Sequence, residues 1–229
     1  CLAEDRYLIV GSGFAAAFHL RWFWTCAPPA DVFVRSAAST LCGFSLAGPN
    51  SREILQRLVR KDLAAAVFKF FDVTETAVGY APSIVTRAGF TGELGYELYA
   101  PAEEAAVLWE FLERRGKEFG LLPYGVGAMQ SLRIEKAFPL AGPDIDGEQS
   151  PFEVGLNRWI DFSKRDFIGR DAVLRKREAG LNRRLVQFRL KDPEPLLFHN
   201  EALVRDGAIV GTITSGNYGH HLGGAIGLG

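Results

Sequence analysis

The sequence predicts an α+β fold, in which a mixed body is followed by a small, strand-rich domain. Amphipathic helical stripes and short apolar strands are interspersed up to about residue 180, and alternation with a period of two residues dominates after it. Hydrophobic residues make up 48% and charged residues 23% of the 229 residues, which is typical of a globular protein with a sizeable core. We place the boundary near residue 182, so that the body spans 1–182 and the second domain 183–229.

The first part of the chain predicts a buried strand at residues 6–10, a helix at 14–24 and a second strand at 31–35. Gly11, Gly13 and Ala16 give this stretch the spacing of a dinucleotide-binding fingerprint. The second strand, however, ends in Arg35 instead of the acidic residue that would bind a ribose, and the strand–helix alternation stops after residue 36. A nucleotide site is therefore disfavoured.

The middle of the chain contains two amphipathic helices around a pair of strands. Asn50 is a candidate N-cap that follows a Gly-Pro turn and precedes an apolar stripe, formed by Ile54, Leu55, Leu58 and Val59. Strands are expected at 84–86 and 96–99, and a helix at 103–115 with Gly116 as its stop. A further helix, marked by Val126, Met129 and Leu132, carries Arg133.

The last fifty residues predict a β domain. Residues 185–190 alternate with a period of two, and Asp206-Gly207 lies between two short apolar runs. An Asp-Gly pair in that position is a strong signal for a two-residue hairpin.

Residues 89–97, with the sequence GFTGELGYE, form the most informative motif. Glycines surround a single carboxylate, Glu93, and glycine lets a backbone turn tightly and approach a flat ligand. A carboxylate offers two acceptor oxygens, which suits a ligand edge with two adjacent N–H donors, such as the 2-amino-4-oxo edge of a pterin.

Bulk properties exclude several classes of function. The net charge of −1 disfavours a nucleic-acid partner, and no apolar run reaches the length of a membrane helix. The three cysteines, Cys1, Cys26 and Cys42, have no metal-like spacing, and we expect reduced thiols and no metal site. A cytoplasmic-type compartment, or the mitochondrial matrix in a eukaryote, fits this pattern.

Four motifs in order resemble the glycine-cleavage T-protein (aminomethyltransferase) family. They are residues 89–97, 131–136 (SLRIEK), 151–156 (PFEVGL) with 167–172 (FIGRDA), and Thr214-Ser215-Gly216. The Leu-Gly-Tyr-Glu-Leu variant and the closing AIGLG look most like the folate-binding part of dimethylglycine and sarcosine dehydrogenases. The resemblance implies a ferredoxin-like body followed by a β-barrel, which is incomplete here.

The resemblance also implies a function. A one-carbon unit would pass from an oxidised N-methyl amine, or an aminomethyl donor, to tetrahydrofolate. A small methylamine-type substrate would be the second ligand, and a dehydrogenase domain or a lipoyl carrier protein would be the partner. FAD would belong only to a preceding domain, because nothing in these residues indicates FAD binding.

Three residues are the candidate folate contacts. Glu93 would accept two hydrogen bonds from the pterin, although an exposed carboxylate on a turn is the simpler interpretation of the same pattern. Arg133 would contact the cofactor or hold the Glu93 carboxylate, as against an i, i+3 pair with Gln130 or Lys136 or a salt bridge to another acid. Tyr96 would stack on the pterin or pack as a strand residue, and packing is the more common outcome.

One expected residue is missing. Family enzymes carry a catalytic aspartate ahead of the first strand, which by alignment would lie upstream of Cys1, and neither Glu4 nor Asp5 replaces it. Both ends of the chain look cut, so we expect an N-terminally truncated body.

Two other functions of this fold stay open, namely a non-catalytic folate-binding accessory protein and a folate-dependent demethylase of another methyl donor. The accessory proteins carry a Lys-Gly-Cys segment, and residues 164–171 contain no cysteine, which argues against that role. The role of His220 and His221 is open, and adjacent histidines on a strand do not form a metal site by themselves.

Overall fold

The structure is a computed structural model that describes residues 1–26 and 28–229. The chain divides into two compact units, residues 1–124 and residues 125–229. Both helices and sheets occur, which confirms the α+β class. The expected boundary near residue 182 lies inside the second unit and stays a prediction.

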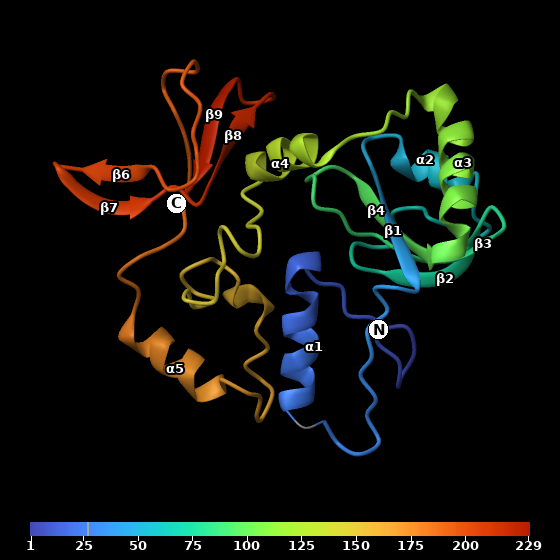
Figure 1. Cartoon of the computed structure of the whole chain (residues 1–229), viewed down its shortest axis with the longest axis horizontal. Helices are drawn as coiled ribbons and strands as arrows, with labels where there is room; N and C mark the ends of the chain where they lie inside the picture. The colour runs from blue at the N-terminus through green and yellow to red at the C-terminus, as the bar shows by residue number, and fades with distance from the viewer. Residues whose placement is uncertain (27) are drawn as a thin grey trace. The chain divides into compact units, whose positions relative to one another are not determined.

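The first unit is built on a four-stranded antiparallel sheet with the order β1-β4-β3-β2 (Figure 1). Its strands are β1 (Leu41–Ala47), β2 (Val73–Val78), β3 (Ala81–Thr86) and β4 (Gly95–Pro101). β4 lies in the interior of the sheet, where Leu46 of β1 is opposite Tyr96 and Ile84 of β3 is opposite Tyr99. The two strands expected around the glycine-rich turn are therefore confirmed as β3 and β4.

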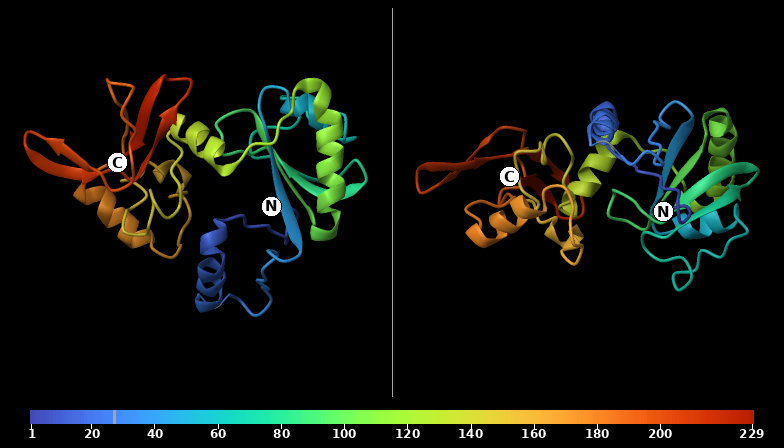
Figure 2. Two further views of the ribbon diagram at one scale, coloured as in Figure 1. Left: turned by 45° about the horizontal axis from the view of Figure 1, so that its top comes forward. Right: turned by 90° about the horizontal axis from the view of Figure 1, so that it is seen from below.

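Two helices, α2 (Ser51–Gln56) and α3 (Ala105–Gly116), pack against this sheet. The short helices η2 (Ala102–Glu104) and η3 (Lys117–Phe119) flank α3, which runs beside the strands in Figures 1 and 2. The predicted apolar stripe is buried, and Leu108 and Leu112 join it from α3. Asn50 is the N-cap of α2, but its side chain donates to the carbonyl oxygen of Phe119 and not to the helix.

The first forty residues correct two predictions. The helix is present as η1 (Gly13–Ala15) and α1 (Ala16–Thr25), but residues 6–10 and 31–35 form no strands. Instead, the N–H of Leu2 donates to the carbonyl oxygen of Arg6 at 2.8 Å in a tight turn. An apolar run becomes a strand only where a neighbouring strand accepts its hydrogen bonds, and none pairs with either segment among the described residues.

The second unit combines two longer helices with a small β region. The longer helices are α4 (Val126–Glu135) and α5 (Arg170–Ala179), and the short helix η4 (Asn157–Trp159) lies between them in the sequence. A three-stranded sheet has the order β5-β9-β8, and β6 and β7 pair separately. These strands are β5 (Gln187–Arg189), β6 (Ala202–Arg205), β7 (Ala208–Thr212), β8 (Ser215–Gly219) and β9 (Gly224–Leu228).

The C-terminal strands confirm the predicted β region. Asp206 and Gly207 have φ values of 54° and 78°, as a two-residue hairpin of the favoured type requires, and the β6–β7 hairpin extends away from β8 and β9 (Figure 2). The strand expected at 185–190 is shorter, at Gln187–Arg189. Ile134 of α4 packs with Ile226 and Leu228 of β9, which attaches the helix to the sheet.

No helix in the described residues has both the length and the apolar character needed to cross a membrane.

Candidate functional site

Residues 89–94 of the glycine-rich motif lie in the loop between β3 and β4, and residues 95–97 begin β4. Gly92 has a φ of 77°, a left-handed conformation that favours glycine, and it directly precedes Glu93. After Glu93, the loop is held to the first unit by Leu94, whose carbonyl oxygen accepts hydrogen bonds from the Gly48 N–H at 2.8 Å and the Ser51 hydroxyl at 3.0 Å. Before Glu93, the loop is held by the packing of Thr91, which is 2% exposed.

Glu93 lies exposed on this anchored loop. Its backbone N–H donates to the hydroxyl of Thr91 at 3.4 Å, and its carboxylate has no hydrogen-bond or ion-pair partner among the described residues. Both carboxylate oxygens are therefore available to a ligand, on a backbone that the surrounding hydrogen bonds hold in place.

Tyr96 is fully buried in the core of the first unit. Its ring is stacked on Phe68 with centroids 6.4 Å apart, and its hydroxyl accepts a hydrogen bond from Nε of Arg52 at 3.1 Å. This is the packing role that we weighed against stacking on a pterin. Burial at the start of β4 makes Tyr96 an anchor for the loop that carries Glu93.

Tyr99, three positions further along β4, forms a short hydrogen bond with a neighbouring carboxylate. Its hydroxyl donates to Glu97 at 2.5 Å. Burial, together with this hydrogen bond and the charge of Glu97, raises the pKa of Tyr99 above its ordinary value. The sequence motif alone gave no indication of this pair.

Arg133 lies in the second unit, on the buried side of α4, with 3% of its side chain exposed. Its guanidinium forms an ion pair with Asp144 at 2.7 Å and also donates to the carbonyl oxygen of Phe138 and the hydroxyl of Ser215. Nε donates to Gln130 at 2.8 Å, so the i, i+3 pair that we weighed against a folate contact is present, and it is partly buried. The carboxylate partner of Arg133 within its own unit is Asp144.

Asp144, the partner of Arg133, is 1% exposed and belongs to none of the four sequence motifs. Its carboxylate also accepts hydrogen bonds from the N–H of Leu140 at 2.8 Å and the hydroxyl of Thr214 at 2.5 Å. Thr214 and Ser215 belong to the fourth motif, so the second and fourth motifs meet at this buried ion pair. The pattern of charges could not reveal Asp144, because it lies in an irregular segment 11 residues from Arg133.

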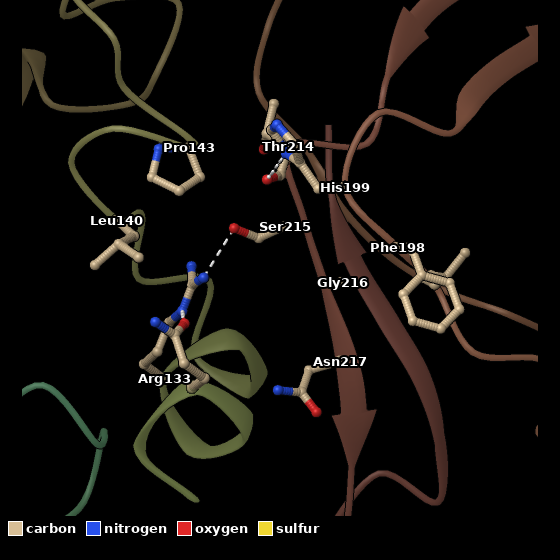
Figure 3. A pocket seen from close by; sticks show the side chains of 11 residues that line it. Arg133, Leu140, Pro143, Phe198, His199, Thr214, Ser215, Gly216 and Asn217 are labelled. Atoms are coloured by element: carbon tan, nitrogen blue, oxygen red, sulfur yellow. Dashed lines mark hydrogen bonds between the residues drawn. The ribbon is translucent and has the colours of Figure 1, made fainter. Parts of the chain in front are cut away.

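A cavity of about 270 Å³ opens beside this network, between α4, residues 197–199 and β8. Figure 3 shows the side chains of Arg133, Ser215 and Asn217 around it, with Leu140, Pro143 and Phe198 as its apolar part. Nδ1 of His199 lies 2.7 Å from the carbonyl oxygen of Thr214, and this bond holds the 197–199 segment to the start of β8.

The two adjacent histidines have separate contacts. His221 binds Glu135, and the ring of His220 lies edge-on to Tyr218 at 5.2 Å. Across residues 1–26 and 28–229, no three His, Cys, Asp or Glu side chains gather as metal ligands, and Cys1, Cys26 and Cys42 are free thiols.

Two family models match the chain. Residues 1–164 match the GCVT N-terminal domain, and residues 183–229 match the glycine cleavage T-protein C-terminal barrel domain.

Known proteins are similar along most of the chain. An aminomethyltransferase from Halothermothrix orenii is 35% identical over the whole chain, which covers 63% of that protein. An aminomethyltransferase from Caldanaerobacter subterraneus subsp. tengcongensis is 33% identical over 99% of the chain, which covers 60% of it. Human mitochondrial dimethylglycine dehydrogenase is 36% identical over 94% of the chain, which covers 25% of it. The chain thus spans about 60% of the length of the bacterial relatives.

A similar fold occurs in the crystal structure of the glycine cleavage system aminomethyltransferase T from Bartonella henselae. The TM-score is 0.60 at 18% identity, and the match covers 83% of this chain and 75% of that one. At this identity the match supports the fold alone.

Proposed function

The chain belongs to the glycine cleavage T-protein family, and from this premise we propose that it binds tetrahydrofolate and takes part in transferring a one-carbon unit to it. The observation that carries the proposal is the exposed carboxylate of Glu93, which has no partner among the described residues and sits on a loop anchored on both sides. Two unused oxygens fit the two N–H donors of a pterin edge.

Arg133 has a less direct role in this proposal. In its own unit it is occupied by Asp144, so we propose that it maintains the shape of the unit around the ligand. The family resemblance supports a contact of Arg133 with folate, which we propose as well. Tyr96 supports the loop by packing, and a stacking contact with the pterin is the weaker alternative for it.

The donor is proposed to be an oxidised N-methyl amine. Similarity to a protein named dimethylglycine dehydrogenase supports a dimethylglycine- or sarcosine-like donor, although the chain covers only a quarter of that relative. Tetrahydrofolate would supply two nucleophilic nitrogens that take up the iminium carbon, and the demethylated amine and a proton would leave with 5,10-methylenetetrahydrofolate as product. The chain would contribute positioning. A dehydrogenase domain or a lipoyl carrier protein would deliver the donor.

Calorimetry with tetrahydrofolate, under anaerobic conditions, tests the binding site. Glu93→Gln keeps the shape of the side chain but removes its charge and one acceptor oxygen, and we expect affinity to fall roughly 10- to 100-fold. Glu113→Gln, which changes an exposed carboxylate on α3, is the matched control and should bind like the wild type. Equal affinities in the Glu93 and Glu113 variants would show that the pterin binds elsewhere.

A second measurement separates an enzyme from an accessory protein. The full coding sequence that contains this chain, supplied with an oxidised N-methyl amine and tetrahydrofolate, should form 5,10-methylenetetrahydrofolate. Folate binding without product would support the non-catalytic alternative.

A further inference from the structure

The cavity beside Arg133 is lined by hydrogen-bond donors that the protein does not use. Four of the five N–H groups of Arg133 are engaged, by Gln130, Phe138, Asp144 and Ser215. The fifth, on Nη2, has no acceptor in the described part of the chain. The hydroxyl of Ser215 accepts from Arg133, and its own proton likewise has no acceptor among these residues.

Two amide side chains add further donors. The oxygen of Gln130 accepts from Nε of Arg133, and the oxygen of Asn217 accepts from the Tyr218 N–H at 2.8 Å. These bonds fix which end of each amide is oxygen. The NH₂ group of each amide is left without a partner among the described residues, and both side chains line the cavity.

The walls of the cavity are held in place before any ligand arrives. Gly216 of β8 packs so closely against Leu197 that an added Cβ would overlap the Leu197 backbone, and the His199–Thr214 hydrogen bond fastens the same segment. A site whose donors are already positioned loses less entropy on binding.

We propose that this cavity binds a small monocarboxylate. Its two oxygens would accept from Arg133, Ser215 and Asn217, and its apolar part would contact the apolar side chains of the lining. A carboxylate only accepts hydrogen bonds, so it matches a lining with many donors, whereas an amide or alcohol would bring a donor of its own. The cavity of about 270 Å³ has room for a small ligand.

Asp144 limits the strength of this site. Because the Asp144 carboxylate already balances the charge of the Arg133 guanidinium, the cavity attracts a carboxylate ligand through its hydrogen-bond donors more than through net charge. The affinity for a simple carboxylate is therefore on the order of millimolar.

Benzoate is the probe for this site. In an NMR titration of the chain, the amides of Arg133, Ser215 and Asn217 should shift saturably as benzoate is added. Benzamide has the same shape but carries an NH₂ in place of one oxygen, and it should bind roughly tenfold more weakly.

Asn217→Asp tests the donors directly. The substitution keeps the oxygen that accepts from Tyr218 but replaces the amide donor by a negative charge, so benzoate should bind roughly tenfold more weakly or not at all. Asn157→Asp adds the same charge on η4, outside the cavity, and should leave benzoate binding unchanged. The amide spectrum of each variant reports whether the fold is retained.

Three results would overturn the proposal: no saturable shift, equal affinities in the two Asn variants, or benzamide binding as tightly as benzoate. The first result would mean that no carboxylate binds in the cavity, and either of the other two would mean that its donors do not select a carboxylate. These measurements concern the second unit and need no folate, so their failure is distinguishable from a failure at Glu93.

Discussion

The ring of His221 and the carboxylate of Glu135 bind each other across 86 residues of sequence. Nδ1 of His221 lies 2.9 Å from one carboxylate oxygen, and the backbone N–H of the same residue donates to the other at 2.8 Å. Glu135 is the last residue of α4, and His221 lies in the turn between β8 and β9. Because Ser131 also donates to the carbonyl oxygen of Tyr218, the helix that carries Arg133 is attached both to β8 and to the turn that follows it.

The hydrogen bond from the backbone N–H of His221 to Glu135 should stabilise the fold more than the bond from the His221 ring. His221→Ala removes an exposed ring and keeps the N–H contact, so the free energy of unfolding should fall by less than about 1 kcal/mol. Glu135→Ala removes both bonds and should cost about 1–3 kcal/mol. Urea unfolding measures the free energy of unfolding of both variants. Glu178→Ala, on the exposed surface of α5, is the control. A larger loss in the His221 variant than in the Glu135 variant would contradict this ranking.

The buried ion pair between Arg133 and Asp144 should be the most sensitive point of the second unit. Asp144→Asn leaves the guanidinium buried without its counter-charge and places an NH₂ among three donors, so it should cost about 3–5 kcal/mol. Arg133→Met combined with Asp144→Leu removes both charges and should cost less than the Asp144 single variant.

Amide exchange in α4 and urea unfolding of the second unit measure this prediction. Asp146→Asn, two residues further along, is an exposed control. A loss below about 1 kcal/mol in Asp144→Asn would mean that the guanidinium finds solvent or another partner.

Features set by local pattern were predictable from the sequence. All four residues of the predicted stripe are buried, but only Ile54 and Leu55 lie on α2, because the helix ends at Gln56 before Leu58 and Val59. Asp206-Gly207 turns because both residues adopt positive φ. The glycines around Glu93 predicted a tight turn that carries a carboxylate, and the structure has Glu93 exposed directly after Gly92, whose φ is 77°. Whether that carboxylate binds a pterin stays a prediction.

Features that depend on distant partners were not predictable. Residues 6–10 and 31–35 have the apolar character of strands, but a strand exists only with a neighbour, and local pattern does not say whether one is present. The carboxylate partners of Arg133 and His221 were missed for the same reason, because Asp144 and Glu135 are brought to them by tertiary packing.

Gly216 should tolerate no side chain. An added Cβ would overlap the Leu197 carbonyl group and lie 2.8 Å from its Cβ, so the two backbone segments would have to separate. Gly216→Ala should therefore cost about 1–3 kcal/mol, and it should also disturb the cavity that we assign to a carboxylate.

Gly211→Ala is the matched control in β7. Its Cβ would meet only a side-chain atom of Leu203 at 3.6 Å, so the change should be neutral or slightly stabilising. Thermal unfolding compares the two glycine variants, and equal melting temperatures would show that Leu197 moves aside at little cost.

Glu153 should make the second unit sensitive to acid. Its carboxylate accepts from the Ser150 N–H at 2.7 Å, from Arg183 at 3.1 Å and from Lys176 at 3.3 Å. The hydrogen bonds from Ser150, followed by those from Arg183 and Lys176, lower the pKa of Glu153 from 4.5 to about 2, although burial opposes them. A lowered pKa stabilises the fold fully above pH 4.5, and this contribution is lost as the pH falls towards 2.

Urea unfolding at a series of pH values, followed for wild type and Glu153→Gln, measures this contribution. The variant should be less stable at pH 7, and the gap should narrow as the pH falls from 4.5 to 2, because protonation turns the wild-type side chain into a neutral one as well. Asp161, whose pKa is lowered chiefly by hydrogen bonds from Ser163, contributes in the same direction in both proteins and so cancels in the difference. In Glu178→Gln, on the exposed surface of α5, the free energy of unfolding should change with pH as it does in the wild type. A gap that stays constant between pH 7 and pH 2 would mean that Glu153 acts through its shape and not through its charge.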